Sequence, residues 1–166
     1  MRSKNVRNIA LSALFAALTA AAMMIHLPLM SQGGYFHLGD SIIYLAASFL
    51  PLPFAALSAA VGGAMGDMLF GYFSWIPFTV IIKALIVLPF FIFKNSKNHT
   101  GFKILACVIS GILSCAAYFF ASRLIYGSFA AAAADILGNI VQEAGSAIIY
   151  ILLSSVLKSS KFNLKG

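Results

Sequence analysis

Three polar residues share one face of the last apolar stretch of the chain. Asn139, Gln142 and Glu143 stand at positions i, i+3 and i+4, and this spacing places their side chains on one side of an α-helix. Two amides beside a carboxylate offer hydrogen-bond donors and acceptors that suit the edge of a heterocycle. The alternative is a polar seam that joins this helix to its neighbours. We expect the three residues to bind a ligand.

Other ionisable residues also lie within or beside apolar stretches: Asp40, Asp67, Lys83, Arg123 and Asp135. A charge in hydrocarbon is costly, so each of them needs a partner or a function. We expect Lys83 to pair with Asp67 or Glu143, and structural pairing and ligand contact do not exclude one another. Asp67 is a second candidate carboxylate for binding.

The remaining candidates lie near the ends of predicted helices. Asp40 and His37 either cap the helix that begins there, because an acid in the first turn complements the helix dipole, or they face a pocket. Trp75, Tyr35 and Tyr72 are typical of the aromatic belt at a membrane interface. They also stand at the rim of the expected pocket, where a planar ligand could stack on them.

Several catalytic motifs are missing from the sequence. It contains no Gly-rich phosphate loop followed by Lys-Ser or Lys-Thr, no His-Glu-x-x-His and no Gly-x-Ser-x-Gly. We therefore expect a protein that is not an enzyme and carries no cofactor or metal ion. The alternatives are a small intramembrane enzyme, a stand-alone carrier and a purely structural assembly factor.

Composition assigns the chain to the membrane. Of its 166 residues 61% are hydrophobic and 9% are charged, and the mean hydropathy is +0.97. About a quarter of the residues of a soluble domain are charged. The net charge of +7 has no basic stripe with interleaved aromatics, so nucleic-acid binding is not expected.

Roughly 20 apolar residues are needed to span a bilayer. With this length as a guide, the sequence predicts one all-α domain over residues 1–166, with six transmembrane helices in one compact bundle. The predicted spans cover about 8–27, 38–51, 53–71, 75–93, 103–125 and 132–157. The basic N-terminus imitates a secretory signal, but its apolar run continues to about Met30, so we expect the first helix to be retained.

The distribution of basic residues gives these spans a direction. With six spans, nine of the 11 Lys and Arg residues fall on one side, and the loops expected on the other side contain none. The positive-inside rule then places both termini in the cytoplasm. The polar candidates all fall in the outer half of the bundle and leave an almost purely apolar inner half. This asymmetry indicates a pocket that opens to the outside.

Small residues recur at four-residue spacing in two helices. Ala13, Ala17 and Ala21 form one such ladder, with Ala16 and Ala20 beside it, and the third helix carries Gly62, Gly63 and Gly66. This spacing lets helices approach closely in lipid. For the third helix we expect internal packing. For the first helix an external partner is equally compatible with the pattern.

Four fragments together resemble the S components, or substrate-binding subunits, of energy-coupling factor (ECF) transporters. They are GYFHLGDSIIYLAA at 34–47, GGAMGD at 62–67, WIPFTVIIKA at 75–84 and GNIVQ at 138–142. The resemblance implies a six-helix subunit in the plasma membrane of a prokaryote that binds a micronutrient from outside. It also implies a transmembrane coupling protein (EcfT-like) and two ATPase subunits as partners, with Ala13, Ala17 and Ala21 as the docking surface.

The resemblance is closest to subfamilies for queuosine precursors (queuine-like 7-deazaguanines) and for hydroxymethylpyrimidine or pyridoxine. All are small planar heterocycles. A deazaguanine presents adjacent N–H donors that a carboxylate such as Glu143 or Asp67 could accept, and this favours a queuosine precursor as the substrate. The chain departs from a typical S component in the very short loop after its third helix.

Overall fold

The computed structural model describes residues 2–27, 36–92 and 99–159, and nearly all of them are helical. Two short strands, β1 (His26–Leu27) and β2 (Phe36–His37), pair antiparallel with His26 opposite His37. The helices in chain order are α1 (Arg2–Met24), α2 (Gly39–Phe49), α3 (Leu52–Leu69), α4 (Ile76–Leu85), α5 (Leu88–Ile92), α6 (His99–Tyr126) and α7 (Phe129–Ser159). The prediction of an all-α protein is confirmed, and the described residues add one pair of two-residue strands to it.

Each of the six predicted spans corresponds to a helical segment, but they differ in length. Four helices are long and apolar enough to cross a membrane, within Lys4–Met24, Leu52–Leu69, Thr100–Tyr126 and Phe129–Leu157. Helix α2 has 11 residues, which corresponds to about 16 Å and is half the thickness of the hydrocarbon core. The number of complete crossings therefore stays a prediction.

The fourth predicted span is broken into α4 and α5. Pro89 lies one residue into α5, and a proline ring clashes with the carbonyl four residues earlier and removes a backbone donor. That carbonyl belongs to Leu85, the last residue of α4. The break therefore lies where the proline rule places it, which the sequence analysis did not predict.

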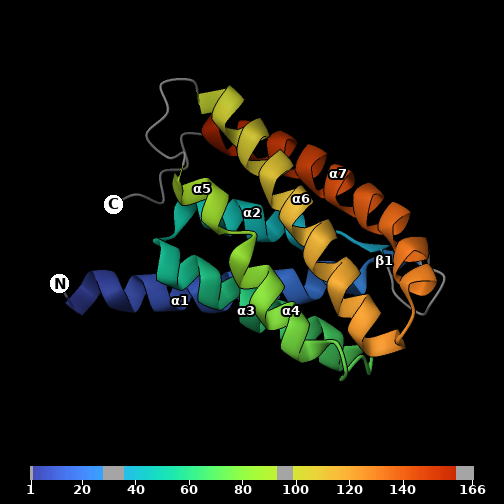
Figure 1. Cartoon of the computed structure of the whole chain (residues 1–166). Coiled ribbons are helices and arrows are strands. Elements are labelled where there is room, and N and C mark those ends of the chain that lie inside the picture. The colour runs from blue at the N-terminus through green and yellow to red at the C-terminus, as the bar shows by residue number, and fades with distance from the viewer. Residues whose placement is uncertain (1, 28–35, 93–98, 160–166) are drawn as a thin grey trace.

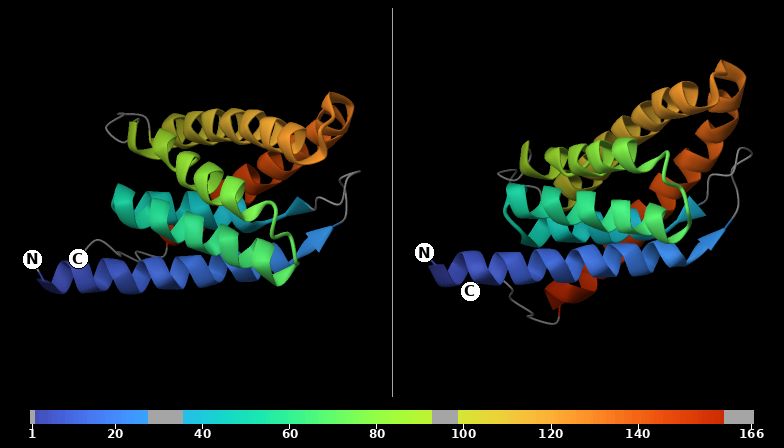
Figure 2. Two further views of the ribbon diagram at one scale, coloured as in Figure 1. Left: turned by 60° about the horizontal axis from the view of Figure 1, so that its bottom comes forward. Right: turned by 90° about the horizontal axis from the view of Figure 1, so that it is seen from below.

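The helices run back and forth between two ends of the molecule (Figures 1 and 2). The start of α1, the start of α6 and the end of α7 lie toward the left in Figure 1, and we call this the terminal end. The β1–β2 pair, the turn from α3 to α4 and the turn from α6 to α7 lie at the opposite end, which we call the hairpin end. Gly71 and Gly127 occupy these two turns with φ of 76° and 69°, where a side chain would be strained.

Helix α1 packs along α3 through small residues. A Cβ atom added at Gly62 would lie 2.8 Å from the carbonyl oxygen of Ala16, and one added at Gly66 would meet the side chain of Met23. The internal packing predicted for the third helix is thus confirmed. Ala16 and Ala20 are buried, whereas the ladder of Ala13, Ala17 and Ala21 faces outward.

The middle of the bundle is filled by aromatic and aliphatic side chains. The rings of Tyr44, Phe90 and Tyr150 are buried and lie with their centroids 5.2 to 6.0 Å apart. Large apolar side chains also cover the outer surface, for example Ile92 and Leu137, which are 73% and 70% exposed. A protein in water would hide such residues, so this surface is the one that a lipid environment would cover.

Candidate functional site

A pocket opens at the hairpin end of the bundle. The space between its walls measures about 480 Å³, a figure that includes the open space at its mouth. Strand β2, the end of α3 with the turn that follows, α4, the end of α6 and the start of α7 all contribute to its walls. The lining residues are His37, Asp67, Tyr72, Trp75, Thr79, Tyr118, Ser122, Asp135, Asn139 and Gln142.

His37 is held at the pocket wall by hydrogen bonds around it. The backbone N–H of Gly39 donates to His37 Nδ1 over 3.1 Å, at the start of α2. The backbone N–H of His37 donates to Gln142 Oε1 over 3.3 Å. His37 therefore both satisfies an N-terminal amide of α2 and lines the pocket, so the two interpretations of this residue are compatible.

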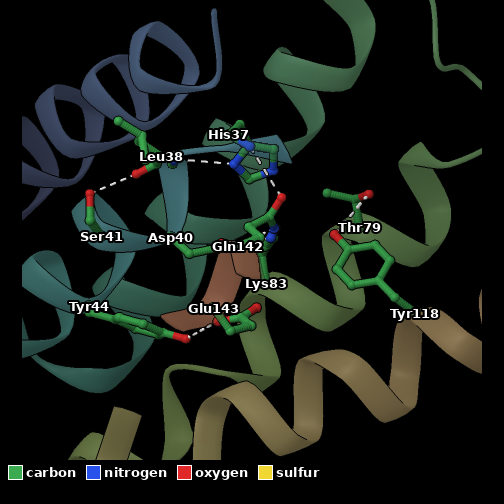
Figure 3. A network of polar contacts seen from close by, with 11 residues as sticks. His37, Leu38, Asp40, Ser41, Tyr44, Thr79, Lys83, Tyr118, Gln142 and Glu143 are labelled. Atoms are coloured by element: carbon green, nitrogen blue, oxygen red, sulfur yellow. Dashed lines mark hydrogen bonds and ion pairs between the residues drawn. The ribbon is translucent and has the colours of Figure 1, made fainter. Parts of the chain in front are cut away.

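An ion pair lies beneath the pocket and joins three helices (Figure 3). Lys83 Nζ of α4 donates to Asp40 Oδ1 of α2 over 2.6 Å, and both side chains are 0% exposed. The expectation that Lys83 pairs with Asp67 or Glu143 is wrong. Gln142 Nε2 of α7 donates to Asp40 Oδ2 over 2.9 Å. Asp40 thus accepts one hydrogen bond at each carboxylate oxygen and connects α4 to α7.

Glu143 points away from the pocket even though it neighbours Gln142. Tyr44 Oη donates to Glu143 Oε2 over 2.5 Å, and a Cβ added at Gly111 would lie 3.3 Å from Glu143 Cβ. Successive residues of a helix are turned by about 100°. Glu143 therefore faces α2 and α6 in the interior, while Asn139 and Gln142 reach the pocket.

The polar interior continues toward the terminal end. The hydroxyls of Ser48 and Tyr150 lie 2.8 Å apart, and Lys103 Nζ donates to Ser154 Oγ over 3.0 Å. The prediction of an almost purely apolar inner half is therefore wrong in these places. Serine and tyrosine hydroxyls are compatible with an apolar sequence pattern because each can find a partner on a neighbouring helix.

One wall of the pocket is aromatic. The ring centroids of Trp75 and Tyr118 lie 6.0 Å apart, and Tyr72 lines the same hollow. The hydroxyl of Tyr118 lies 3.5 Å from Thr79 Oγ1, and Lys83 Nζ lies 5.1 Å from the centre of the Tyr118 ring. A flat ligand can stack on such a wall.

Two carboxylates line the pocket as well. Asp67 lies near the end of α3 and Asp135 near the start of α7; both are buried. Ser122 Oγ lies 3.4 Å from Asp135 Oδ2. The guanidinium carbon of the adjacent Arg123 lies 4.6 Å from the ring centre of Phe129. Among the described residues, no group of three His, Cys, Asp or Glu side chains is arranged to hold a metal ion.

The structure thus brings together five of the eight residues expected to bind the ligand, and it places Asp40, Lys83 and Glu143 below them. The five that line the pocket are His37, Asp67, Trp75, Asn139 and Gln142. Tyr35 lies outside the described residues. Sequence reasoning missed Thr79, Tyr118 and Ser122; the latter two stand four residues apart on α6, a spacing that could have indicated a shared polar face.

Two comparisons with known proteins indicate the class of protein to which the chain belongs. A family model described as "ECF-type riboflavin transporter, S component" matches residues 3–159. A protein of Pyrococcus woesei, named "Uncharacterized protein in gap 3'region", is 30% identical over 142 residues, which are 86% of this chain and 95% of that protein.

The family match confirms the resemblance to S components. S components are substrate-binding subunits of membrane transporters and are generally non-catalytic. The apolar helices of the chain and its pocket are consistent with that class. The chain belongs to the family of ECF-type riboflavin transporter S components and is a multi-pass, substrate-binding subunit of a prokaryotic membrane importer.

Proposed function

We propose that this S component captures a small planar heterocycle in the pocket at the hairpin end. The observation that supports this most directly is the composition of the walls. Aromatic rings of Trp75 and Tyr118 face the same hollow as the amide of Asn139 and the carboxylate of Asp67. Rings provide a stacking surface, and the polar groups can orient a ligand through its edge.

The network below the pocket gives its floor a defined shape. Both ends of the Gln142 amide are engaged, its oxygen by the His37 backbone and its nitrogen by Asp40. The amide orientation follows from these bonds, and the Lys83–Asp40 pair in turn holds Asp40 in place. We propose that Asp40, Lys83 and Glu143 position the floor, while Asn139, Trp75, Asp67 and His37 contact the ligand.

The identity of the heterocycle is the finer part of the proposal. The family name specifies riboflavin, whereas the sequence fragments favour a queuosine precursor, with hydroxymethylpyrimidine and pyridoxine as alternatives. Thermal melting and titration calorimetry of the purified protein with queuine, the aminomethyl-deazaguanine precursor, hydroxymethylpyrimidine, pyridoxine, thiamin and riboflavin distinguish them. We expect one member to bind tightly at 1:1 stoichiometry, and no binding by any of them would contradict the capture function.

Single substitutions test the location of the site. Asn139→Ala and Trp75→Ala should each weaken binding of the ligand found in that panel by about tenfold or more, because each removes a direct contact worth about 1–3 kcal/mol. Ile140→Ala is the matched control, because Ile140 is the next residue of α7 and is 51% exposed on the outer surface. Equal affinity in all three variants would place the site elsewhere.

We further propose that the outward ladder of α1 docks on a transmembrane coupling protein associated with two ATPase subunits. Ala13, Ala17 and Ala21 are exposed, and the same helix uses other small residues to pack on α3. Ala13→Phe and Ala17→Phe should abolish uptake into cells while ligand binding to the purified protein persists. Ile148→Phe, at a 60% exposed position of α7, should leave uptake intact. Uptake by the alanine-ladder variants would refute this docking surface.

For orientation we propose that six helical segments cross the membrane, with the hairpin end outside and both termini in the cytoplasm. Lys4 near the start of α1 and Ser74 in the turn from α3 to α4 are exposed, and these two segments lie at opposite ends of the bundle (Figure 2). In a chain whose native cysteines are replaced by serine, an impermeant thiol reagent should label Ser74→Cys in intact cells. Lys4→Cys should react only after lysis, and the reverse pattern would invert the topology.

A further inference from the structure

The charged residues of the pocket indicate which form of a heterocycle it would bind. Its described lining includes two carboxylates, Asp67 and Asp135, and neither Lys nor Arg. These two carboxylates give the described walls of the pocket an affinity for positively charged groups.

Lys83 lies below the pocket, and its charge is already matched by Asp40. Its Nζ lies 2.6 Å from Asp40 Oδ1, and both side chains are fully buried. A lysine and an aspartate in direct contact form a pair with no net charge at longer range. Lys83 also lies behind the Tyr118 ring, so Tyr118, and not the ammonium group, faces the ligand space.

His37 adds a hydrogen-bond donor to the pocket but no positive charge in this arrangement. Its Nδ1 accepts the hydrogen bond from the Gly39 N–H, and a ring nitrogen that accepts a hydrogen bond carries no proton. The imidazole is therefore the neutral tautomer, with its proton on Nε2. Arg123 contacts the Phe129 ring and does not line the pocket.

An aromatic wall and buried carboxylates in one pocket are suited to a cation. Aromatic faces attract positively charged groups, and the attraction grows when water is excluded. A buried carboxylate that meets an ammonium group regains part of the solvation that it lost. A phosphate ester would instead bring like charges together, which disfavours anionic forms of the same ring.

We propose, on the basis of the capture function above, that the pocket selects an amine-bearing, positively charged form of its planar heterocycle and rejects phosphorylated forms. The amine lies toward Asp67 and Asp135, and the ring stacks on the wall formed by Trp75 and Tyr118. Selection operates between compounds that share a ring and differ in one substituent.

Matched pairs of ligands test this selectivity in the purified protein by titration calorimetry at pH 7. The pairs are pyridoxamine with pyridoxine, the aminomethyl with the hydroxymethyl form of the pyrimidine, and aminomethyl- with cyano-deazaguanine. For the ring that binds, we expect the amine to bind about tenfold tighter or more, since a charge-assisted hydrogen bond replaces a neutral one. Pyridoxamine phosphate should bind at least about tenfold more weakly than pyridoxamine.

Variants of the two carboxylates connect the selectivity to its cause. Asp67→Asn and Asp135→Asn should each reduce the ratio of amine to neutral affinity toward one, whereas Asp67→Glu and Asp135→Glu, which keep the charge, should retain a preference for the amine. Melting temperatures establish that the compared variants are folded. If the Asn variants unfold, the ligand pairs on the native protein still decide the question.

The outcomes separate this inference from the proposed function. Equal or tighter binding of the neutral member, or tight binding of riboflavin alone, would overturn the preference for an amine while capture of a heterocycle stands. A ratio that stays unchanged in both Asn variants would remove the two carboxylates as its source and overturn the assignment. Absence of binding by every compound would overturn both proposals.

Discussion

Removing one partner of the buried ion pair should destabilise the protein strongly. Lys83→Met keeps the length of the side chain but removes its charge, and it leaves Asp40 fully buried without a counter-charge. Breaking a buried pair in this way costs about 3–5 kcal/mol. For a protein of this size each kcal/mol lowers the melting temperature by about 2–4 °C, so the expected fall is on the order of 6–20 °C.

The double variant Asp40→Asn/Lys83→Met separates the ion pair from general packing. It has no buried charge at this position, and the side-chain amide that replaces the Asp40 carboxylate can still accept from Gln142 Nε2, whose present bond to Asp40 is 2.9 Å. Replacement of both members of a buried pair is often close to neutral. The double variant should therefore melt well above Lys83→Met, in detergent and followed by intrinsic fluorescence.

Two results would refute this reasoning. If the Lys83→Met variant melted at the same temperature as the native protein, the loss of the counter-charge to the buried Asp40 carboxylate would have no cost in stability. If the effects of the two substitutions were additive, the interaction energy from the double-mutant cycle would be near zero. Either result would mean that the contact between Asp40 and Lys83 does not stabilise the fold.

Two further variants test packing and the interior hydrogen bonds. Gly62→Ala should destabilise the protein by about 1–3 kcal/mol, because the added Cβ would lie 2.8 Å from the backbone oxygen of Ala16. Gly145→Ala is the control and should melt near the native temperature, because the nearest atom to its added Cβ is 3.4 Å away. Tyr44→Phe removes the donor that Glu143 uses over 2.5 Å, and we expect a loss of about 1–3 kcal/mol in the free energy of unfolding. Melting curves check both, and stable Gly62→Ala or Tyr44→Phe variants would contradict the corresponding contact.

The candidate site also shows why helix spacing alone is a limited guide. The i, i+3, i+4 pattern predicts that Asn139, Gln142 and Glu143 share one face of α7, yet of these three Asn139 and Gln142 line the pocket and Glu143 does not. The rotation between adjacent residues turns Glu143 toward Tyr44 of α2. Which of two neighbours meets the ligand depends on where the surrounding helices lie, and a single helix pattern contains no such information.

The pairing of Lys83 illustrates the same limit at longer range. All four acids of the chain were expected in the outer half of the bundle, and Asp67 or Glu143 was the predicted partner of Lys83. In the structure α4 and α2 approach so that Lys83 meets Asp40, 43 residues away along the chain. Similarly, the short pair of β1 and β2 was missed because two-residue strands have too few residues for a period-2 pattern.

Composition and the distribution of charge were sufficient to predict a helical membrane protein, the approximate positions of six helical segments and a polar half, because these depend on transfer free energies of individual residues. The four ordered fragments indicated the S-component class that the family match confirms. The partner of each buried charge, the residues that form the aromatic wall and the direction of Glu143 arise from contacts between helices distant in sequence. Those contacts depend on how α2, α4, α6 and α7 pack together, which the local pattern of any one helix does not specify.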